Sequence, residues 1–332
     1  MDRKENWLRA IRNDRPSWLP EPWEPFWGAG GPLPFFFFDP LSRSFRPFPT
    51  PKDTPFRDAW GVTWLLQEGS PGAVPLVTDE NKVIRDIARW EDDVRFPTLD
   101  GIDWTEADAT LAGIDRSETL VMPMVTGGIF ETSHNLMGFE DCLAAMLLEP
   151  EAMGRLYAAL ADWKIRMIEQ VMDHLRPEVV HYHDDWGGKD RLFMAPEVWR
   201  TLLRPHHQRI VDAVKRRGAL FMHHADCVCA PIAGDMADMG IDIWQGVIPQ
   251  NDIPAIQRRI GTRMALMGGI DAQVIDRPDA DEETIRAEVR RCIDAYVPHG
   301  AFLPCIPNIA AIFPHVERIY RDEIRVYGAK KR

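Results

Sequence analysis

Residues 221–230 read FMHHADCVCA and place two histidines, an aspartate and two cysteines directly after an apolar run. Side chains alternate between the two faces of a β-strand. A strand here puts His224 on the same face as Met222, and Asp226 continues that face. An imidazole and a carboxylate held together are ligands for zinc, or a pair for acid–base chemistry. The sequence therefore predicts a reactive strand end at His224.

Polar groups follow other apolar runs in the same way. His183, Asp184 and Asp185 end the run at 179–183, and we predict catalytic roles for all three. One aspartate is suited to accepting a proton or binding a cation, while the other has a simple alternative as a cap of the next segment. Cys305 lies in the apolar run at 301–306. A lone cysteine is usually an inert core residue, but this one is expected at the same end of the sheet.

Apolar runs alternate with helical patterns along most of the chain. The expected strands are 120–125, 179–183, 219–224, 241–247, 263–267 and 301–306, and the expected helices are 135–148, 150–175, 196–217, 231–239, 253–260, 281–296 and 312–326. Such alternation predicts parallel βαβ units. We expect an α/β fold with a (β/α)8 TIM-type barrel, whose site lies at the carboxyl ends of the strands. A doubly wound sheet is the alternative, but the glycine-rich phosphate turn after its first strand is missing.

The N-terminal segment differs from the rest. We expect residues 1–332 to form one barrel domain, with residues 1–60 wrapping over it. Proline and aromatic residues are dense at 15–56 and exclude a long helix there. The segment is either a layer that caps the core or an aromatic wall for a flat substrate. On the second interpretation, Phe36, Trp64 and Trp186 contact the substrate.

Composition limits the class of protein. A hydrophobic fraction of 45% with 27% charged residues is typical of a globular protein. The net charge of -12 argues against nucleic-acid binding, and no run of about 18 apolar residues indicates a membrane span. The charged N-terminus has no apolar signal region, and five cysteines, an odd number, favour a reducing cytoplasm. Monomer and homodimer are both compatible with the sequence.

Several blocks resemble the uroporphyrinogen decarboxylase superfamily: HDDWGG at 183–188, HHADC at 223–227, GGID at 268–271 and DAWGVTW at 58–64. The resemblance covers nearly the whole chain and implies a TIM-type barrel with its site at the carboxyl end. It also implies one of two activities, decarboxylation of a porphyrinogen or methyl transfer with a cobalamin protein. Decarboxylases of this kind carry an arginine-rich N-terminal motif that this chain lacks, which favours methyl transfer.

The methyltransferase branch typically binds zinc through a His-x-Cys motif and a distant cysteine. The resemblance then assigns His224, Asp226 and Cys305 as the metal ligands, with Asp226 where the family has a cysteine. A carboxylate in place of a thiolate leaves a harder, more Lewis-acidic zinc, which is suited to polarising an oxygen. We therefore expect a methyltransferase that moves a methyl group from a methoxy compound, such as an aryl methyl ether, to the cobalt of a separate corrinoid protein that carries the cobalamin.

Three alternatives stay open at this point. The first is methyl transfer from methylcobalamin to a thiol of the coenzyme M type. The second is a metal-free decarboxylase in which an aspartate supplies a proton. The third is a barrel without catalytic activity that binds a small ligand or a corrinoid protein.

Overall fold

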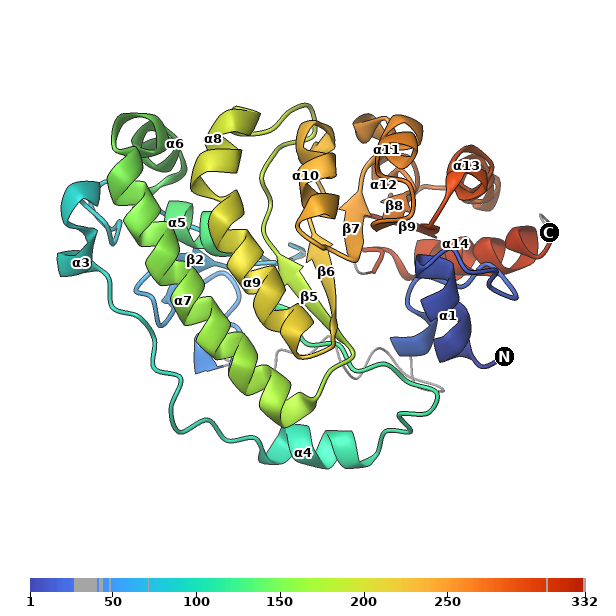
Figure 1. Cartoon of the computed structure of the whole chain (residues 1–332), viewed down its shortest axis with the longest axis horizontal. Coiled ribbons are helices and arrows are strands. Elements are labelled where there is room, and N and C mark those ends of the chain that lie inside the picture. Colours follow the sequence, from blue (N-terminus) through green and yellow to red (C-terminus); the bar gives the residue numbers. More distant parts are fainter. Residues whose placement is uncertain (27–40, 42–43, 48, 71, 309, 331–332) are drawn as a thin grey trace.

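A parallel β-sheet forms the centre of the molecule (Figure 1). The computed structural model describes residues 1–26, 41, 44–47, 49–70, 72–308 and 310–330. In that part of the chain, six strands pair in sequence order, each parallel to the next: β4 (Met124–Val125), β5 (Val179–His183), β6 (Leu220–His224), β7 (Ile243–Val247), β8 (Ala265–Gly269) and β9 (Phe302–Cys305). The predicted α/β fold is confirmed, with these six strands at the expected places.

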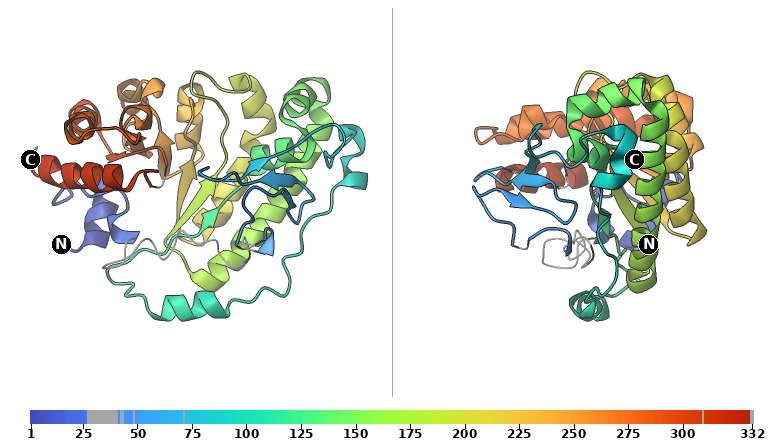
Figure 2. Two further views of the ribbon diagram at one scale, coloured as in Figure 1. Left: turned by 180° about the vertical axis from the view of Figure 1, so that it is seen from behind. Right: turned by 90° about the vertical axis from the view of Figure 1, so that its left-hand side faces the viewer.

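Helices from the connections between the strands, together with the helix after the last strand, cover one face of this sheet (Figures 1 and 2). They are α5 (Ile129–Met137), α6 (Phe139–Leu148), α7 (Pro150–Leu175), α8 (Pro196–Leu202), α9 (Arg204–Arg216), α10 (Ala233–Asp238), α11 (Ile253–Ile260), α12 (Ala272–Ile275), α13 (Glu282–Tyr296) and α14 (Pro314–Gly328). Before the sheet come α1 (Arg3–Ile11), α3 (Trp90–Asp93) and α4 (Thr105–Ala112). None of the helices in the described residues is long and apolar enough to cross a membrane.

Two expected helices are interrupted at residues that disfavour a continuous helix. Residues 196–217 form α8 and α9 because Pro205 lies in the first turn of α9, where its missing N–H is tolerated. The helix expected at 135–148 is divided between the end of α5 and α6, which meet at Gly138 with φ 95°. A left-handed φ of this size is readily adopted only by glycine. Both interruptions follow from local chain chemistry.

A small antiparallel sheet lies on the side of the parallel sheet away from α7 and α9 (Figure 2). Its strands are β1 (Phe56–Arg57), β2 (Thr63–Leu65) and β3 (Val74–Pro75), and it was not foreseen from the sequence. The sequence expectation was a wrapping segment at residues 1–60, which reaches only the first of these strands. Phe56 of β1 and Trp64 of β2 belong to the same apolar core as Val180 of β5.

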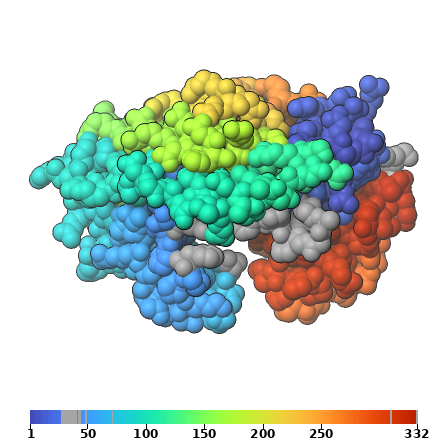
Figure 3. All heavy atoms as spheres, turned by 90° about the horizontal axis from the view of Figure 1, so that it is seen from below, coloured from blue at the N-terminus to red at the C-terminus, as the bar shows by residue number. Residues whose placement is uncertain are grey.

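Residues 1–26 pack under the inner face of the parallel sheet. Trp7, Trp23 and Phe26 share an apolar cluster with residues of β5 to β9. The backbone N–H of Leu120 donates to Pro25 O at 2.9 Å, and Lys4 Nζ donates to Arg116 O at 2.7 Å. Seen from below, the chain around α4 crosses the same face and reaches this N-terminal part (Figure 3). The N-terminal residues therefore cap the core.

Replacing Trp7 with alanine should destabilise the fold. Trp7 is fully buried, its Nε1 donates to Pro22 O at 2.8 Å, and its ring meets Phe26 edge to face at 5.1 Å. We expect the free energy of unfolding to fall by about 3–5 kcal/mol, the usual loss for a buried Trp. Urea denaturation followed by circular dichroism measures this. Leu147→Ala, at a side chain that is 69% exposed, is the control and should change stability by less than about 0.5 kcal/mol.

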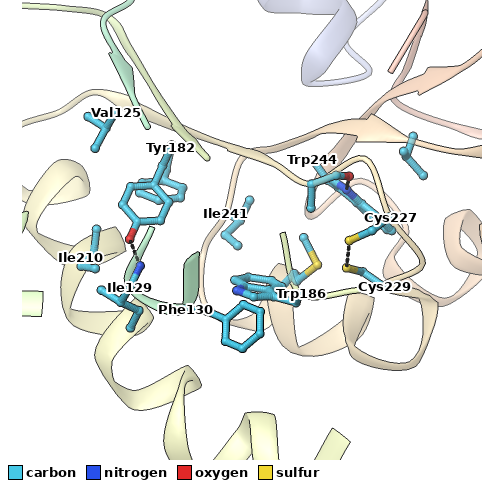
Figure 4. Packing of buried hydrophobic residues seen from close by; sticks show 14 of the residues in the cluster. Val125, Ile129, Phe130, Tyr182, Trp186, Ile210, Cys227, Cys229, Ile241 and Trp244 are labelled. Carbon is cyan, nitrogen blue, oxygen red and sulfur yellow. Dashed lines mark hydrogen bonds between the residues drawn. The ribbon is translucent and has the colours of Figure 1, made fainter. Parts of the chain in front are cut away.

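The strand register places four polar side chains side by side. His183 pairs with His224, and His224 pairs with Gln245. His181, two residues before His183, shares its face because side chains alternate along a strand. The opposite face carries Tyr182 and other large apolar side chains that pack under the helices (Figure 4). A polar row thus lies on the inner face of the sheet, at the carboxyl ends of its strands.

Candidate metal centre

Three side chains converge at the carboxyl ends of β5 and β6. One ligand atom from each of His183, Asp185 and His224 lies within 4.8 Å of the other two. The rings of His183 and His224 are 4.4 Å apart between centroids and nearly perpendicular. His183 Nε2 is 3.4 Å from Asp185 Oδ2. Among the described residues these three form the group of His, Cys, Asp and Glu side chains that can share one metal ion.

Gln245 fixes the orientation of the His224 ring. Gln245 Nε2 donates to Pro307 O at 2.8 Å, so the amide oxygen is the atom that faces His224. That oxygen lies against His224 Nδ1, which must therefore carry the proton and donate it. His224 Nε2 keeps its lone pair for a metal. Such support of one ring nitrogen by a neighbouring oxygen is usual for metal-binding histidines.

Asp226 lies next to this group but faces elsewhere. Its backbone N–H donates to Asp185 Oδ1 at 3.0 Å, which leaves Asp185 Oδ2 toward His183. The Asp226 carboxylate instead pairs with Lys189, at 3.1 Å from Nζ. Strand β6 ends at His224, so the alternation of faces that predicted Asp226 beside His224 no longer holds two residues later. The structure brings His224 together with Asp185 rather than with Asp226.

Cys305 is also separate from this group. It ends β9 next to Gly269 of β8 and is fully buried in the apolar cluster that includes Trp23 and Leu303. Burial raises the pKa of its thiol well above the usual range. In the sheet order, the two strands β7 and β8 lie between β9 and β6, which carries His224. The cysteine pair Cys227 and Cys229 is likewise buried, with 3.4 Å between the sulfurs (Figure 4).

Asp184 and Trp186, predicted as catalytic and substrate-binding residues, are both completely buried. The Asp184 carboxylate accepts hydrogen bonds from Trp186 Nε1 at 3.2 Å and from the backbone N–H groups of Phe130 and Glu131 at the start of α5. The Trp186 ring stacks on His223 at 4.1 Å. These contacts position α5 against the sheet. They leave neither side chain accessible to a substrate.

Glu131 of α5 lies beside the candidate metal centre, and no pattern in the sequence indicated it. Its Oε1 is 3.5 Å from His183 Nε2. Burial raises the pKa of Glu131 to about 8. Burial also lowers the pKa of His183, but the Glu131 and Asp185 carboxylates outweigh it and raise that pKa to about 9. The pKa of Asp185 falls to about 2 because His183 offsets its burial.

Metal affinity should therefore rise with pH. With a pKa of about 9, His183 is protonated in the metal-free protein at pH 7 and must release that proton to bind a metal. Affinity for zinc should increase by up to about tenfold per pH unit until pH 9. Competition with a chelator at pH 6.5, 7.5 and 8.5 measures the slope. Because Glu131 has a pKa of about 8, its charge beside His183 is present mainly at the highest of these pH values. Glu131→Gln removes that charge and should therefore change the affinity chiefly at pH 8.5. A pH-independent affinity in the wild type would contradict the assignment of His183.

The third predicted substrate residue, Trp64, lines a cavity of about 50 Å³ beside the small antiparallel sheet. Arg46 and Lys164 line the same cavity. Phe36 lies outside the described residues. Thr132 of α5 contributes to the cavity wall, directly after Glu131 in the chain. Two consecutive residues of α5 thus lie at the cavity and beside the candidate metal centre, respectively.

The donor set itself fits a catalytic divalent metal. Two imidazoles and one carboxylate leave a coordination position open for a substrate, as in catalytic zinc sites. Nitrogen and oxygen donors without a thiolate make such a metal a harder Lewis acid. The contact of Gln245 with His224 supplies the orienting partner that such a site needs. His183, Asp185 and His224 are the residues that would hold the ion.

The fold and this cluster define a barrel-type α/β protein with a candidate metal centre at the carboxyl end of its sheet. Residues 71–303 match the family described as Uroporphyrinogen decarboxylase (URO-D), and the chain belongs to this family. It is 24% identical over 256 residues to a uroporphyrinogen decarboxylase of Azoarcus sp. (strain BH72). The aligned region covers 74% of this chain and 61% of that protein.

A second curated relative and a solved structure are also similar to this chain. A uroporphyrinogen decarboxylase of Shewanella piezotolerans (strain WP3 / JCM 13877) is 27% identical over 202 residues, 58% of this chain and 51% of that protein. The chain thus spans between about half and three fifths of the length of these curated relatives. Among solved structures, a methyltransferase from Methanosarcina mazei matches with a TM-score of 0.65 and 16% identity, over 100% of this chain and 99% of that one. That likeness confirms the TIM-type barrel fold.

Proposed function

We propose that this protein is a metal-dependent methyltransferase that moves a methyl group from a methoxy compound to the cobalt of a separate corrinoid protein. The observation that carries the proposal is the convergence of His183, Asp185 and His224 within 4.8 Å at the carboxyl end of the sheet. The metal ligands that we propose therefore differ in two residues from those expected from the sequence, with His183 and Asp185 in place of Asp226 and Cys305.

The chemistry of the donor set favours an oxygen rather than a sulfur substrate. Bound in this set, zinc would supply Lewis acidity toward the ether oxygen. In such a transfer the methyl–oxygen bond would break with its electron pair left on the oxygen, and cobalt(I) of the partner would supply the electron pair for the new bond to the methyl carbon. An aryl methyl ether leaves as a phenolate, whose negative charge needs electrostatic stabilisation.

The chain's own residues keep the centre in one arrangement. Gln245 holds the His224 ring, and the backbone of Asp226 holds Asp185. Asp184 fixes the start of α5, and thereby the position of Glu131 beside His183. Preorganised groups of this kind lower the barrier because they need no rearrangement during the reaction. Methyl transfer to a thiol is less favoured, because no thiolate lies in the ligand group among the described residues.

Reconstitution with defined components tests the proposal. The zinc-loaded protein is mixed with reduced cobalamin, as a substitute for the corrinoid protein, and an aryl methyl ether. We expect the absorption spectrum of methylated cobalamin to appear, and to require both zinc and the ether. His224→Ala should abolish the signal and the bound zinc. His299→Ala, at an exposed histidine outside the group, is the matched control and should retain both.

Two results would rule the proposal out. One is a purified protein that binds no divalent metal at micromolar concentration. The other is methyl transfer that persists in full after His224→Ala. The same samples also allow a test of thiol methylation, by adding methylcobalamin and a free thiol in place of the ether.

Decarboxylation is the second candidate, favoured by the names of the curated relatives and by basic residues in the lining of the cavity beside α5. A cavity with Arg46 and Lys164 suits a substrate that carries carboxylates. Release of carbon dioxide from a porphyrinogen without added metal would support this candidate. Such activity, unchanged in His224→Ala, would replace the methyltransferase proposal.

A further inference from the structure

Four side chains with rings form a continuous group around the junction of α5 and α6, which we call the ring cluster. Its members are Phe130 and His134 of α5, Phe139 at the start of α6, and Phe193 in the loop between β5 and α8. Phe139 meets Phe193 with 4.8 Å between ring centroids and His134 with 5.4 Å, in both cases edge to face. Phe130 meets His134 at 5.2 Å and Phe193 at 6.2 Å.

The ring cluster adjoins the candidate metal centre through α5. His134 follows Glu131 by three residues, and side chains at this spacing lie on the same face of a helix, one turn apart. Glu131 Oε1 is 3.5 Å from His183 Nε2. Burial lowers the pKa of His134 to about 4, and the carboxylates of Asp184 and Asp185 oppose this shift only in part. The His134 ring is therefore uncharged at neutral pH, and it lies within range of the loop that carries the proposed ligand Asp185.

Backbone contacts hold the ring cluster in place, while one of its rings is exposed. The N–H of Phe130 donates to Asp184 Oδ2 at 3.2 Å. The N–H of Phe193 donates to Trp186 O at 2.9 Å. Phe130 is fully buried, whereas Phe139 is 39% exposed. A group that is already ordered and has one open ring takes up a further ring without the cost of ordering its own side chains.

We propose that the ring cluster binds the aryl group of an aryl methyl ether, with Phe139 and Phe193 as the residues that determine specificity for it. The aryl group extends the edge-to-face arrangement that these rings adopt among themselves, a preferred geometry of aromatic pairs. An aryl ring held there leaves its methoxy group free to reach the candidate metal centre, one turn of α5 away. This inference names the substrate class of that centre, and so it rests on the proposed methyltransferase function.

The size of the exposed surface favours a small molecule over a protein as the occupant. Each partner of a stable protein interface buries roughly 800 Å², whereas Phe139 is the one exposed phenylalanine of the ring cluster. A whole aromatic side chain buries only roughly 150–250 Å², so the open part of this ring matches a single aryl group. The sequence had instead predicted Trp64 and Trp186 for this role, but Trp186 is completely buried and Trp64 lines the cavity beside the small antiparallel sheet.

Binding of two matched probes to the zinc-loaded protein, measured by NMR titration, tests the inference. The probes are 4-methoxyphenol and trans-4-methoxycyclohexanol, which carry the same substituents on an aromatic and on a saturated ring. We expect the aromatic probe to bind about three- to tenfold more tightly, the effect of contacts between rings beyond the area they bury. Phe139→Leu and Phe193→Leu keep an apolar side chain but remove a ring, so each should lower this preference by about twofold or more, and the double variant should remove it. Leu148→Ala, at a side chain of α6 that is 77% exposed, is the control and should not change it.

Equal affinity of the wild type for the two probes would overturn the inference, and this comparison needs no variant to be folded. An undiminished preference in the double variant would also overturn it. The preference should persist in His224→Ala, because the contacts between rings involve no metal. Its loss in that variant would place the selectivity at the metal and overturn the inference as well.

The binding measurements involve no methyl transfer, so the inference and the proposed function fail in different ways. A preference for the aromatic probe without methyl transfer in any sample would count against the proposed function and leave the aryl site standing. Methyl transfer from 4-methoxyphenol, together with equal affinities for the two probes, would overturn the inference and leave the proposed function standing.

Discussion

Asp185→Asn should abolish tight zinc binding without unfolding the protein. Asparagine keeps the oxygen that accepts the Asp226 N–H at 3.0 Å, so the loop after β5 stays in place. It loses the negative charge that faces His183 and that completes the ligand group. Loss of a mere supporting contact weakens metal binding about 10–100-fold, so the loss of a ligand should exceed that range. Zinc titration of the apoprotein, with circular dichroism as a check of folding, measures the effect.

The neighbouring Asp226 offers a matched control. Asp226→Asn makes the same chemical change two residues after the end of β6. The Asp226 carboxylate, however, pairs with Lys189 and not with the histidines. Zinc affinity should then stay within about threefold of the wild type, because surface ion pairs contribute little. The opposite pattern, with zinc lost in Asp226→Asn and retained in Asp185→Asn, would restore the ligand set expected from the sequence.

A good part of the fold could be predicted because its signals are local. The interruption at Pro205 needs only the missing N–H of proline. The six strands were recognisable as short apolar runs between helical patterns, and their parallel order follows from the connecting helices. The small antiparallel sheet was missed because β1 to β3 are two or three residues long, too short for alternation to be visible.

The candidate site was predicted only where a strand determines the direction of a side chain. His183 and His224 end adjacent strands in register, so their proximity followed from the parallel sheet. Asp226 lies beyond the end of its strand, where the turn and Lys189 determine its direction. Cys305 does end a strand, but the N-terminal tryptophans that surround it are distant in sequence. Their packing is a tertiary effect that no local pattern reports.

Gln245 had a signal that could have been used. It is a polar residue within an apolar strand, two residues after Ile243, and therefore on the inner face. A buried amide needs partners for its donors and acceptor, which makes a role beside His224 a reasonable expectation. Glu131 offered no comparable signal. Its position depends on the contact of α5 with Asp184, which joins segments more than 50 residues apart.

Asp184→Ala should destabilise the whole protein, in contrast to Asp185→Asn. The Asp184 carboxylate is fully buried and accepts three hydrogen bonds, from Trp186 Nε1 and from the N–H groups of Phe130 and Glu131. His207 Nε2 is a further 2.9 Å contact, although its N–H is not aligned for a hydrogen bond. Removing the carboxylate leaves these donors buried and unpaired. We expect the free energy of unfolding to fall by about 3–5 kcal/mol.

Guanidinium denaturation measures this loss, and Asp190→Asn is the control, because its side chain is 70% exposed and the change should stay within about 0.5 kcal/mol. The close contact of Gly128 with the Asp184 side chain provides an independent test. A Cβ at residue 128 would overlap Asp184, so Gly128→Ala should also destabilise the protein. If Asp184→Ala instead leaves stability unchanged and abolishes methyl transfer, Asp184 is a catalytic group, as its sequence context first suggested. The two adjacent aspartates thus separate the stability of the barrel from its chemistry, because one faces the helices and the other faces the histidines.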